Sequence, residues 1–173
     1  MSLEEDKKCY PPFLVKEFEK SRKRLERERN QKEVYSYNPT KITDFLPLIH
    51  CIWKISNKGY QEQYWGKRGQ WGDNYMETLE TFSGDARASL KTNKEELITM
   101  TPKQREMLQK LYDMIDFFTE DPEAPGSDYG ENDEAIVNDP KWLKIGEYAK
   151  IVYEELSGDD LDEWEAQRKK RQL

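Results

Sequence analysis

Residues 101–120, TPKQREMLQKLYDMIDFFTE, carry the clearest helix signal in this chain of 173 residues. Thr101 can act as the N-cap, Pro102 suits the first helical position, where no backbone N–H is needed, and Gln104 can complete a capping box. Apolar side chains then recur at helical spacing, which predicts one buried face: Met107, Leu108, Leu111, Tyr112, Ile115 and Phe118. We expect this helix to end near Glu120.

Similar signals flank this helix on both sides. Downstream, Asp139-Pro140 repeats the opening with a cap and a proline, and Gly158 suits a left-handed C-cap. Upstream, Asp44 can cap a strongly apolar helix that Gly59 is expected to end. We therefore expect the helices near 44–58, 102–119 and 140–157 to form the centre of the fold.

The remaining segments predict further helices. Pro11-Pro12 opens a helix that becomes almost wholly charged, which indicates a helical arm around 12–34. Asp73 can cap a helix that Gly84 should break, and a last helix should start at Asp159 or Asp160. No segment shows sustained strand alternation. The sequence thus predicts an all-α fold, a single compact domain over residues 1–173 with six to eight irregularly packed helices.

Composition narrows the class of protein. Aromatic residues make up 12% of the chain, which argues against disorder, and there is no apolar run long enough to cross a membrane. The two cysteines, Cys9 and Cys51, lack metal or redox spacing, and the start has no signal-peptide pattern. We expect a cytoplasmic protein without a membrane anchor.

Charge is distributed unevenly along the chain. Residues 1–72 hold 15 basic and 10 acidic residues, whereas residues 73–173 hold 13 and 25. Acids concentrate in a predicted loop around 121–138, which contains no Lys or Arg. Such a surface can attract a basic partner, and the candidate contact residues are Asp121, Glu123, Asp128, Glu131, Asp133 and Glu134, with Tyr129 as an aromatic anchor. A tolerated surface insertion is the alternative.

The same acids do not predict a metal site. Carboxylates are the ligands that Ca²⁺ prefers, but the spacing of an EF-hand loop is absent. The single histidine, His50, and two isolated cysteines cannot supply a zinc ligand set. His50 and Cys51 are adjacent in a predicted helix, where their side chains point about 100° apart, so they do not form a catalytic dyad. We predict no metal, no cofactor and no catalytic set.

A second candidate surface is the glycine-rich stretch around residues 64–72. Trp65, Arg68 and Trp71 are residue types that dominate protein interfaces, and aromatic rings beside Lys67 and Arg68 could also stack on single-stranded bases. The alternative is that the two Trp rings fold back onto the core. Nucleotide-binding glycine fingerprints are absent, and nucleic acid is the less favoured partner because only two cations accompany the rings.

These observations favour a non-enzymatic protein-binding module. Its specific form would be an acidic inhibitor that neutralises a basic partner such as a toxin domain, as bacterial immunity proteins do. Two other functions stay open: a helical enzyme or small-ligand protein with a pocket near Trp65, Trp71 and His50, or a contact protein for single-stranded nucleic acid.

Overall fold

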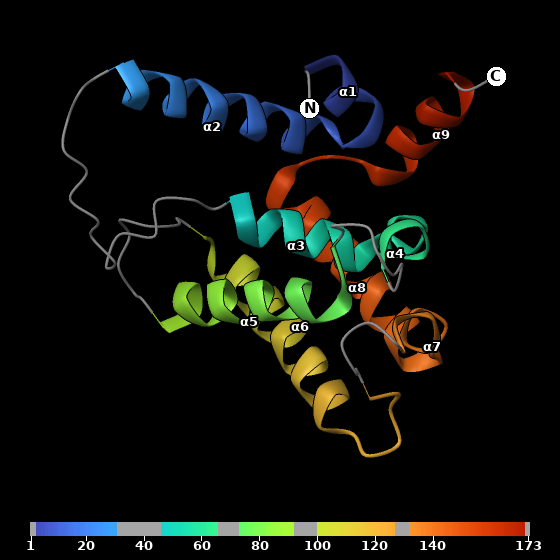
Figure 1. Ribbon diagram of the computed structural model, residues 1–173. Helices are drawn as coiled ribbons and strands as arrows, with labels where there is room; N and C mark the ends of the chain where they lie inside the picture. The colour runs from blue at the N-terminus through green and yellow to red at the C-terminus, as the bar shows by residue number, and fades with distance from the viewer. Residues whose placement is uncertain (1–2, 31–45, 66–72, 92–99, 127–131, 172–173) are drawn as a thin grey trace.

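A computed structural model describes residues 3–30, 46–65, 73–91, 100–126 and 132–171 (Figure 1). This part of the chain contains helices and no strand, so the all-α prediction is confirmed. The helices pack irregularly into one compact domain. In chain order they are α1 (Leu3–Cys9), α2 (Pro12–Asn30), α3 (Leu46–Ser56), α4 (Lys58–Tyr64), α5 (Tyr75–Lys91), α6 (Pro102–Glu120), α7 (Asp133–Val137), α8 (Pro140–Ser157) and α9 (Leu161–Arg171).

The strongest local signals act as expected. Thr101 Oγ1 accepts the Gln104 N–H at 3.1 Å, and Gln104 Oε1 accepts the Thr101 N–H at 3.0 Å, which closes the capping box of α6. Asp139 caps α8 by accepting the Lys141 N–H at 2.7 Å. Gly158 ends α8 with a φ of 77°, the left-handed conformation that glycine adopts most readily.

Two glycines do not end helices as the sequence predicted. Gly59 lies inside α4, because Asn57 starts a new helix directly after α3 by accepting the Tyr60 N–H at 3.0 Å. Gly84 lies inside α5, which continues to Lys91. A glycine costs a helix only about 1 kcal/mol, and burial of Phe82 and Ala86 in the core outweighs that cost.

Asp73 also has a different role from the expected helix cap. The cap of α5 is Asn74, whose side chain accepts the Glu77 N–H at 2.9 Å. Asp73 forms an ion pair with Lys54 and accepts the Tyr60 hydroxyl at 2.7 Å and the Thr78 hydroxyl at 3.1 Å. One carboxylate therefore joins α3, α4 and α5.

The predicted acidic loop contains a short helix that the sequence did not reveal. Residues Asp133–Val137 form α7, and both Ile136 and Val137 are buried in the core. Since these two side chains lie close together in sequence among acids, they showed no helical period. Residues 127–131 of that loop lie outside the described residues, as do residues 31–34 of the predicted arm and Asp44.

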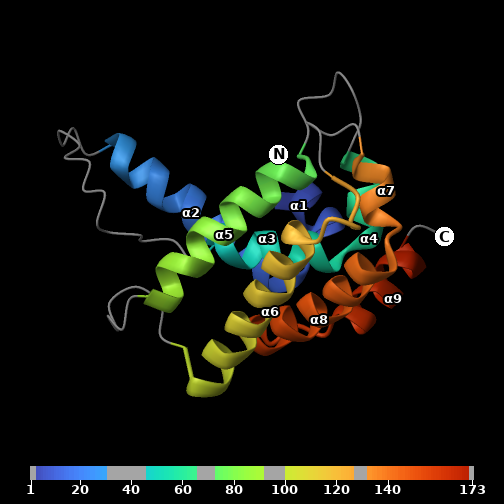
Figure 2. The same ribbon diagram turned by 90° about the horizontal axis from the view of Figure 1, so that it is seen from below.

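Helix α3 lies at the centre of the fold. In Figure 1, α1 and α2 lie on one side of it and α5 and α6 on the other, and Figure 2 shows α8 running beside α6. Most of its side chains are consequently buried: Leu48, Ile49, Cys51, Ile52, Trp53 and Ile55. Helix α8 packs closely on α3, because a Cβ built at Gly146 would lie 3.2 Å from the Ile55 carbonyl oxygen.

Gln61 completes the junction of α3, α4 and α8. Its side-chain amide nitrogen donates to the carbonyls of Lys54 at 2.8 Å and Ile55 at 2.7 Å, and its amide oxygen accepts the Trp142 indole N–H at 3.0 Å. Both Gln61 and Trp142 are buried. Two backbone carbonyls at the end of α3 are satisfied in this way, as buried polar groups require.

An aromatic cluster attaches α1 and α2 to α3. The His50 ring lies edge-on to Tyr10 at 5.4 Å and to Phe18 at 5.1 Å, and it stacks with Trp53 at 6.0 Å between centroids. Burial lowers the pKa of His50 to about 3, with a smaller contribution from the Lys54 charge. His50 is therefore neutral at physiological pH and acts as a packing residue.

Glycine to alanine substitutions should have opposite effects at two helical positions. Gly84→Ala adds a methyl group with no atom within 4 Å, so we expect it to raise the free energy of unfolding by about 0.5–1 kcal/mol. Gly146→Ala presses its methyl against the Ile55 carbonyl, so we expect a loss of about 1 kcal/mol. Denaturant unfolding of both variants measures the difference, and equal stabilisation would disprove the close contact.

The lowered pKa of His50 predicts a loss of stability in mild acid. In the unfolded chain His50 takes up a proton near pH 6.5, and in the folded protein it does not until about pH 3. Stability is thus full above pH 6.5 and falls below it, by about 2 kcal/mol at pH 5. In His50→Phe this contribution should be absent. Denaturant unfolding of both proteins at pH 7 and pH 5 measures this difference. An equal change in the free energy of unfolding between the two pH values would contradict the prediction.

Candidate functional site

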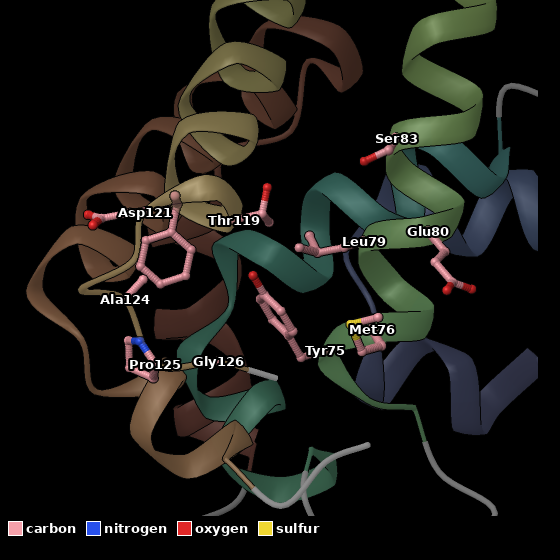
Figure 3. Close-up of a pocket in the computed structure, with 11 residues that line it drawn as sticks. Tyr75, Met76, Leu79, Glu80, Ser83, Thr119, Asp121, Ala124, Pro125 and Gly126 are labelled. Carbon is pink, nitrogen blue, oxygen red and sulfur yellow. The ribbon is translucent and has the colours of Figure 1, made fainter. Parts of the chain in front are cut away.

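A cleft of about 420 Å³ opens between α5 and the end of α6, and we call it the α5–α6 cleft (Figure 3). One wall is a face of α5, and the other is formed by the last turn of α6 with the segment that follows it. The α5 wall comprises Tyr75, Met76, Leu79, Glu80 and Ser83. The opposite wall comprises Phe118, Thr119, Asp121, Ala124, Pro125 and Gly126.

The α5 wall is fixed at its start by a buried carboxylate. Asp133 is fully buried and accepts the Tyr75 backbone N–H at 3.2 Å, which ties α7 to the first residue of α5. The Tyr75 ring packs edge-on against Trp65 at 5.8 Å and Trp142 at 5.2 Å. Burial, and then the Asp133 charge, raise the pKa of Tyr75, so its phenol stays protonated.

The opposite wall is held by a compact turn. Asp121 accepts the Glu123 N–H at 2.9 Å, and its own carbonyl accepts the Ala124 N–H at 3.0 Å. Asp121 also forms an ion pair with Lys141 of α8, and this hydrogen bond holds the pKa of Asp121 below its usual range. Phe118 packs on Trp142 at 5.4 Å between centroids. Both walls of the cleft therefore rest on the same indole ring.

Negative charge is concentrated beside the cleft. Between Tyr112 and Gly126 the chain contains no Lys or Arg and five acids: Asp113, Asp116, Glu120, Asp121 and Glu123. The C-terminal end of a helix is itself partly negative, so acids there are unfavourable, and α6 has no basic residue in its last turn. Among the described residues only Asp121 of these five forms an ion pair. Arg87 interacts electrostatically with Asp116, and Lys141 with Glu123 as well as Asp121. The end of α6 therefore carries an excess of acids that the nearby cations offset only in part.

Apolar side chains are exposed in the same region. Phe117 is 77% exposed, the largest value among the big hydrophobic residues of the described chain, and Met76 on the α5 wall is 38% exposed. Phe117 does not line the cleft, so Met76 is the exposed apolar side chain at the concave site itself.

The structure separates the residues that the sequence proposed for partner binding. Asp121 lines the α5–α6 cleft, and Glu123 and Glu134 are exposed. The prediction that Asp133 contacts a partner is corrected by its position. Asp133 is fully buried and accepts the N–H of the first residue of α5, so it does not present its charge to a partner. Five candidates lie outside the described residues: Arg68, Trp71, Asp128, Tyr129 and Glu131.

Trp65 follows the alternative in which its ring folds back onto the core. It is 4% exposed and packs against Tyr75 and Trp142. His50 lies in a different aromatic cluster, with Tyr10, and so the two residues do not share a pocket. Burial also raises the pKa of Cys51 to about 12, which keeps its thiol protonated beside a neutral His50.

Sequence reasoning missed the α5 wall of the cleft. Met76, Leu79, Glu80 and Ser83 follow the i, i+3, i+4, i+7 spacing of one helix face. The sequence predicted a helix after Asp73 but no open face on it. The polar members Glu80 and Ser83 were the available signal that the face is only partly covered.

Comparison with protein families, with curated proteins and with solved structures finds no match to this chain. Within the described residues, no helix has the length and hydropathy needed to span a bilayer. The described residues also contain no group of three or more His, Cys, Asp or Glu side chains positioned for a metal ion.

The buried carboxylate at the base of the cleft predicts unequal effects at two neighbouring acids. Asp133→Ala leaves the buried Tyr75 N–H without its acceptor, so we expect the free energy of unfolding to fall by about 1–3 kcal/mol. Glu134→Ala removes an exposed acid and should change it by less than about 0.5 kcal/mol. Denaturant unfolding measures both, and equal losses would argue against a positioning role for Asp133.

Proposed function

We propose that this chain is a non-enzymatic protein-binding module whose α5–α6 cleft receives a basic segment of a partner protein. The observation that carries the proposal is an apolar cleft with Glu80 on one wall, beside an end of α6 where acids outnumber cations. A basic toxin domain, neutralised as by an immunity protein, would be one such partner.

The charges support a basic partner. Acids at the negative end of α6 repel one another and the helix dipole. Cations of a partner would relieve that repulsion, and the field of the acids would accelerate their approach. Asp121 is already paired with Lys141, and Arg87 and Lys141 also act on Asp116 and Glu123. The contacts therefore fall first to the exposed Glu120, and then to the exposed Asp116 and Glu123.

The shape of the cleft supports a segment that carries an apolar anchor. Leu79 and Phe118 form its buried floor, and Met76 lies half-exposed above them. Glu80 and Asp121 border the cleft from its two walls. An apolar side chain flanked by Lys or Arg matches this arrangement of apolar floor and acidic border.

Neutralising the acids at the end of α6 should weaken binding of a defined basic peptide. The probe is a helical peptide with one Phe flanked by lysines, measured by fluorescence anisotropy. We expect Glu120→Gln/Glu123→Gln to raise the Kd by about 3- to 10-fold at low salt, and added salt to reduce that difference. The matched control, Glu26→Gln/Glu163→Gln, removes two exposed charges elsewhere and should change the Kd by less than about twofold.

The same assay tests the apolar part of the cleft. A second peptide with Ala in place of Phe should bind more weakly, because the anchor no longer fills the cleft. Equal binding of the two peptides, or equal weakening by the control variant, would show that binding is nonspecific attraction to an acidic protein.

A further inference from the structure

The outer face of α6 carries a stripe of exposed side chains, which we call the α6 stripe. Figure 2 shows α6 between α5 and α8, with its length open to view. The members of the stripe are three and four residues apart in turn, the spacing that keeps side chains on the contact face of two paired helices. All of them are exposed: Lys103, Glu106, Lys110, Asp113, Phe117 and Glu120.

Phe117 is the apolar member of the stripe. Its ring is 77% exposed, although an aromatic ring contributes most to stability when it is buried. Met107 and Met114 follow the same seven-residue spacing beside the stripe, and both are only partly buried. Methionine side chains are flexible and adapt to an incoming surface. The stripe therefore offers a ring and two adaptable apolar neighbours to a second helix.

The charges of α6 are arranged against the dipole of the helix. Residues 102–110 carry three cations and one acid, whereas residues 111–120 carry three acids and no cation. The helix dipole favours the reverse order, with acids at the start and cations at the end. This order is unfavourable within one chain. It becomes favourable between two antiparallel copies of α6, because the basic half of each then lies against the acidic half of the other.

Contacts within the chain offset this pattern only in part. Lys103 pairs with Glu155 at 2.7 Å, but its side chain is still 69% exposed. The Lys110 Nζ lies 4.6 Å from the centroid of the Tyr148 ring, a contact with a ring and not with an acid. Arg87 acts on one acid of the second half. The basic and acidic halves of α6 therefore keep opposite charges that a second helix can meet.

We propose that the α6 stripe is a self-association surface, on which α6 of a second copy of this chain lies antiparallel. A two-fold axis between residues 111 and 112 places Lys103 opposite Glu120 of the second copy. The same axis places Lys110 opposite Asp113 of the second copy. Phe117 then packs against the aliphatic stems of the two lysines. Each contact occurs twice, because the same stripe serves both copies.

This inference goes beyond the function proposed for the α5–α6 cleft. The α6 stripe shares no residue with the lining of that cleft. Glu120 is also one of the acids proposed to attract a basic partner, so the variants that test the stripe leave Glu120 unchanged. The test contains no peptide, and its outcome is therefore separate from that of the peptide-binding assay.

Charge reversal tests the pairing of Lys110 with Asp113. Sedimentation velocity of the full chain over a range of concentrations at low salt measures the dissociation constant of the dimer. We expect Lys110→Glu and Asp113→Lys each to raise it by at least about 10-fold, because each sets like charges opposite one another twice. The double variant Lys110→Glu/Asp113→Lys restores opposite charges and should return to within about threefold of the unmodified protein.

Two further comparisons complete the test. Phe117→Ser should weaken the dimer by about 10-fold. The matched reversals Lys16→Glu and Glu26→Lys, at exposed positions of α2, should change its dissociation constant by less than about twofold. Circular dichroism confirms that every variant folds.

Three outcomes would overturn the inference. A chain that stays monomeric at every concentration would leave the α6 stripe to a different partner. A dimer that the single reversals leave intact would associate through another face. A double variant that does not recover would show that Lys110 and Asp113 do not lie opposite one another.

Discussion

The hydrogen bond from the Trp142 indole to Gln61 is the constraint on which the structure depends. Gln61 satisfies the last carbonyls of α3 and accepts the indole N–H, so a single amide fixes α3, α4 and α8 together. The amide can be buried because its nitrogen and its oxygen are both hydrogen-bonded. The rings of Tyr75 and Phe118, one from each wall of the α5–α6 cleft, pack directly on Trp142. One ring from each wall of the cleft is therefore positioned by the centre of the core.

The buried and the exposed carboxylates of this protein differ in how many partners they have. Inside the fold, carboxylates have partners: Asp73 joins Lys54 and two hydroxyls, Asp159 accepts the Tyr153 hydroxyl at 2.9 Å, and Asp133 accepts a backbone N–H. At the end of α6 the acids are exposed and mostly without cations in the described residues. A carboxylate that faces water costs little, so nothing in the fold requires those acids. Their concentration beside an apolar cleft is the reason for proposing a basic partner.

Much of the fold could be predicted from local chemistry, and the site could not. Thr101 and Asp139 correctly predict where their helices begin, because a capping side chain bonds to backbone N–H groups only a few residues away. Gly59 and Gly84 were misread because the outcome depended on burial of distant side chains, which a local pattern does not contain. The composition showed that this region is acidic, but it did not show which acids are buried. Asp133 is buried because α7 packs into the core, whereas Glu123 stays exposed. The α5 wall was not predicted as part of a site, since only the three-dimensional arrangement shows where no neighbouring element covers a helix face.

Trp142 also limits how far the α5–α6 cleft can change shape. Its indole supports Tyr75 from one wall and Phe118 from the other. Trp142 is 1% exposed, hydrogen-bonded to Gln61 and packed against Trp65, so a second arrangement of its ring would break the core junction itself. Close-packed interiors resist such rearrangement. The cleft should therefore receive a partner segment without a change in the positions of its two walls, because a ring from each wall rests on Trp142.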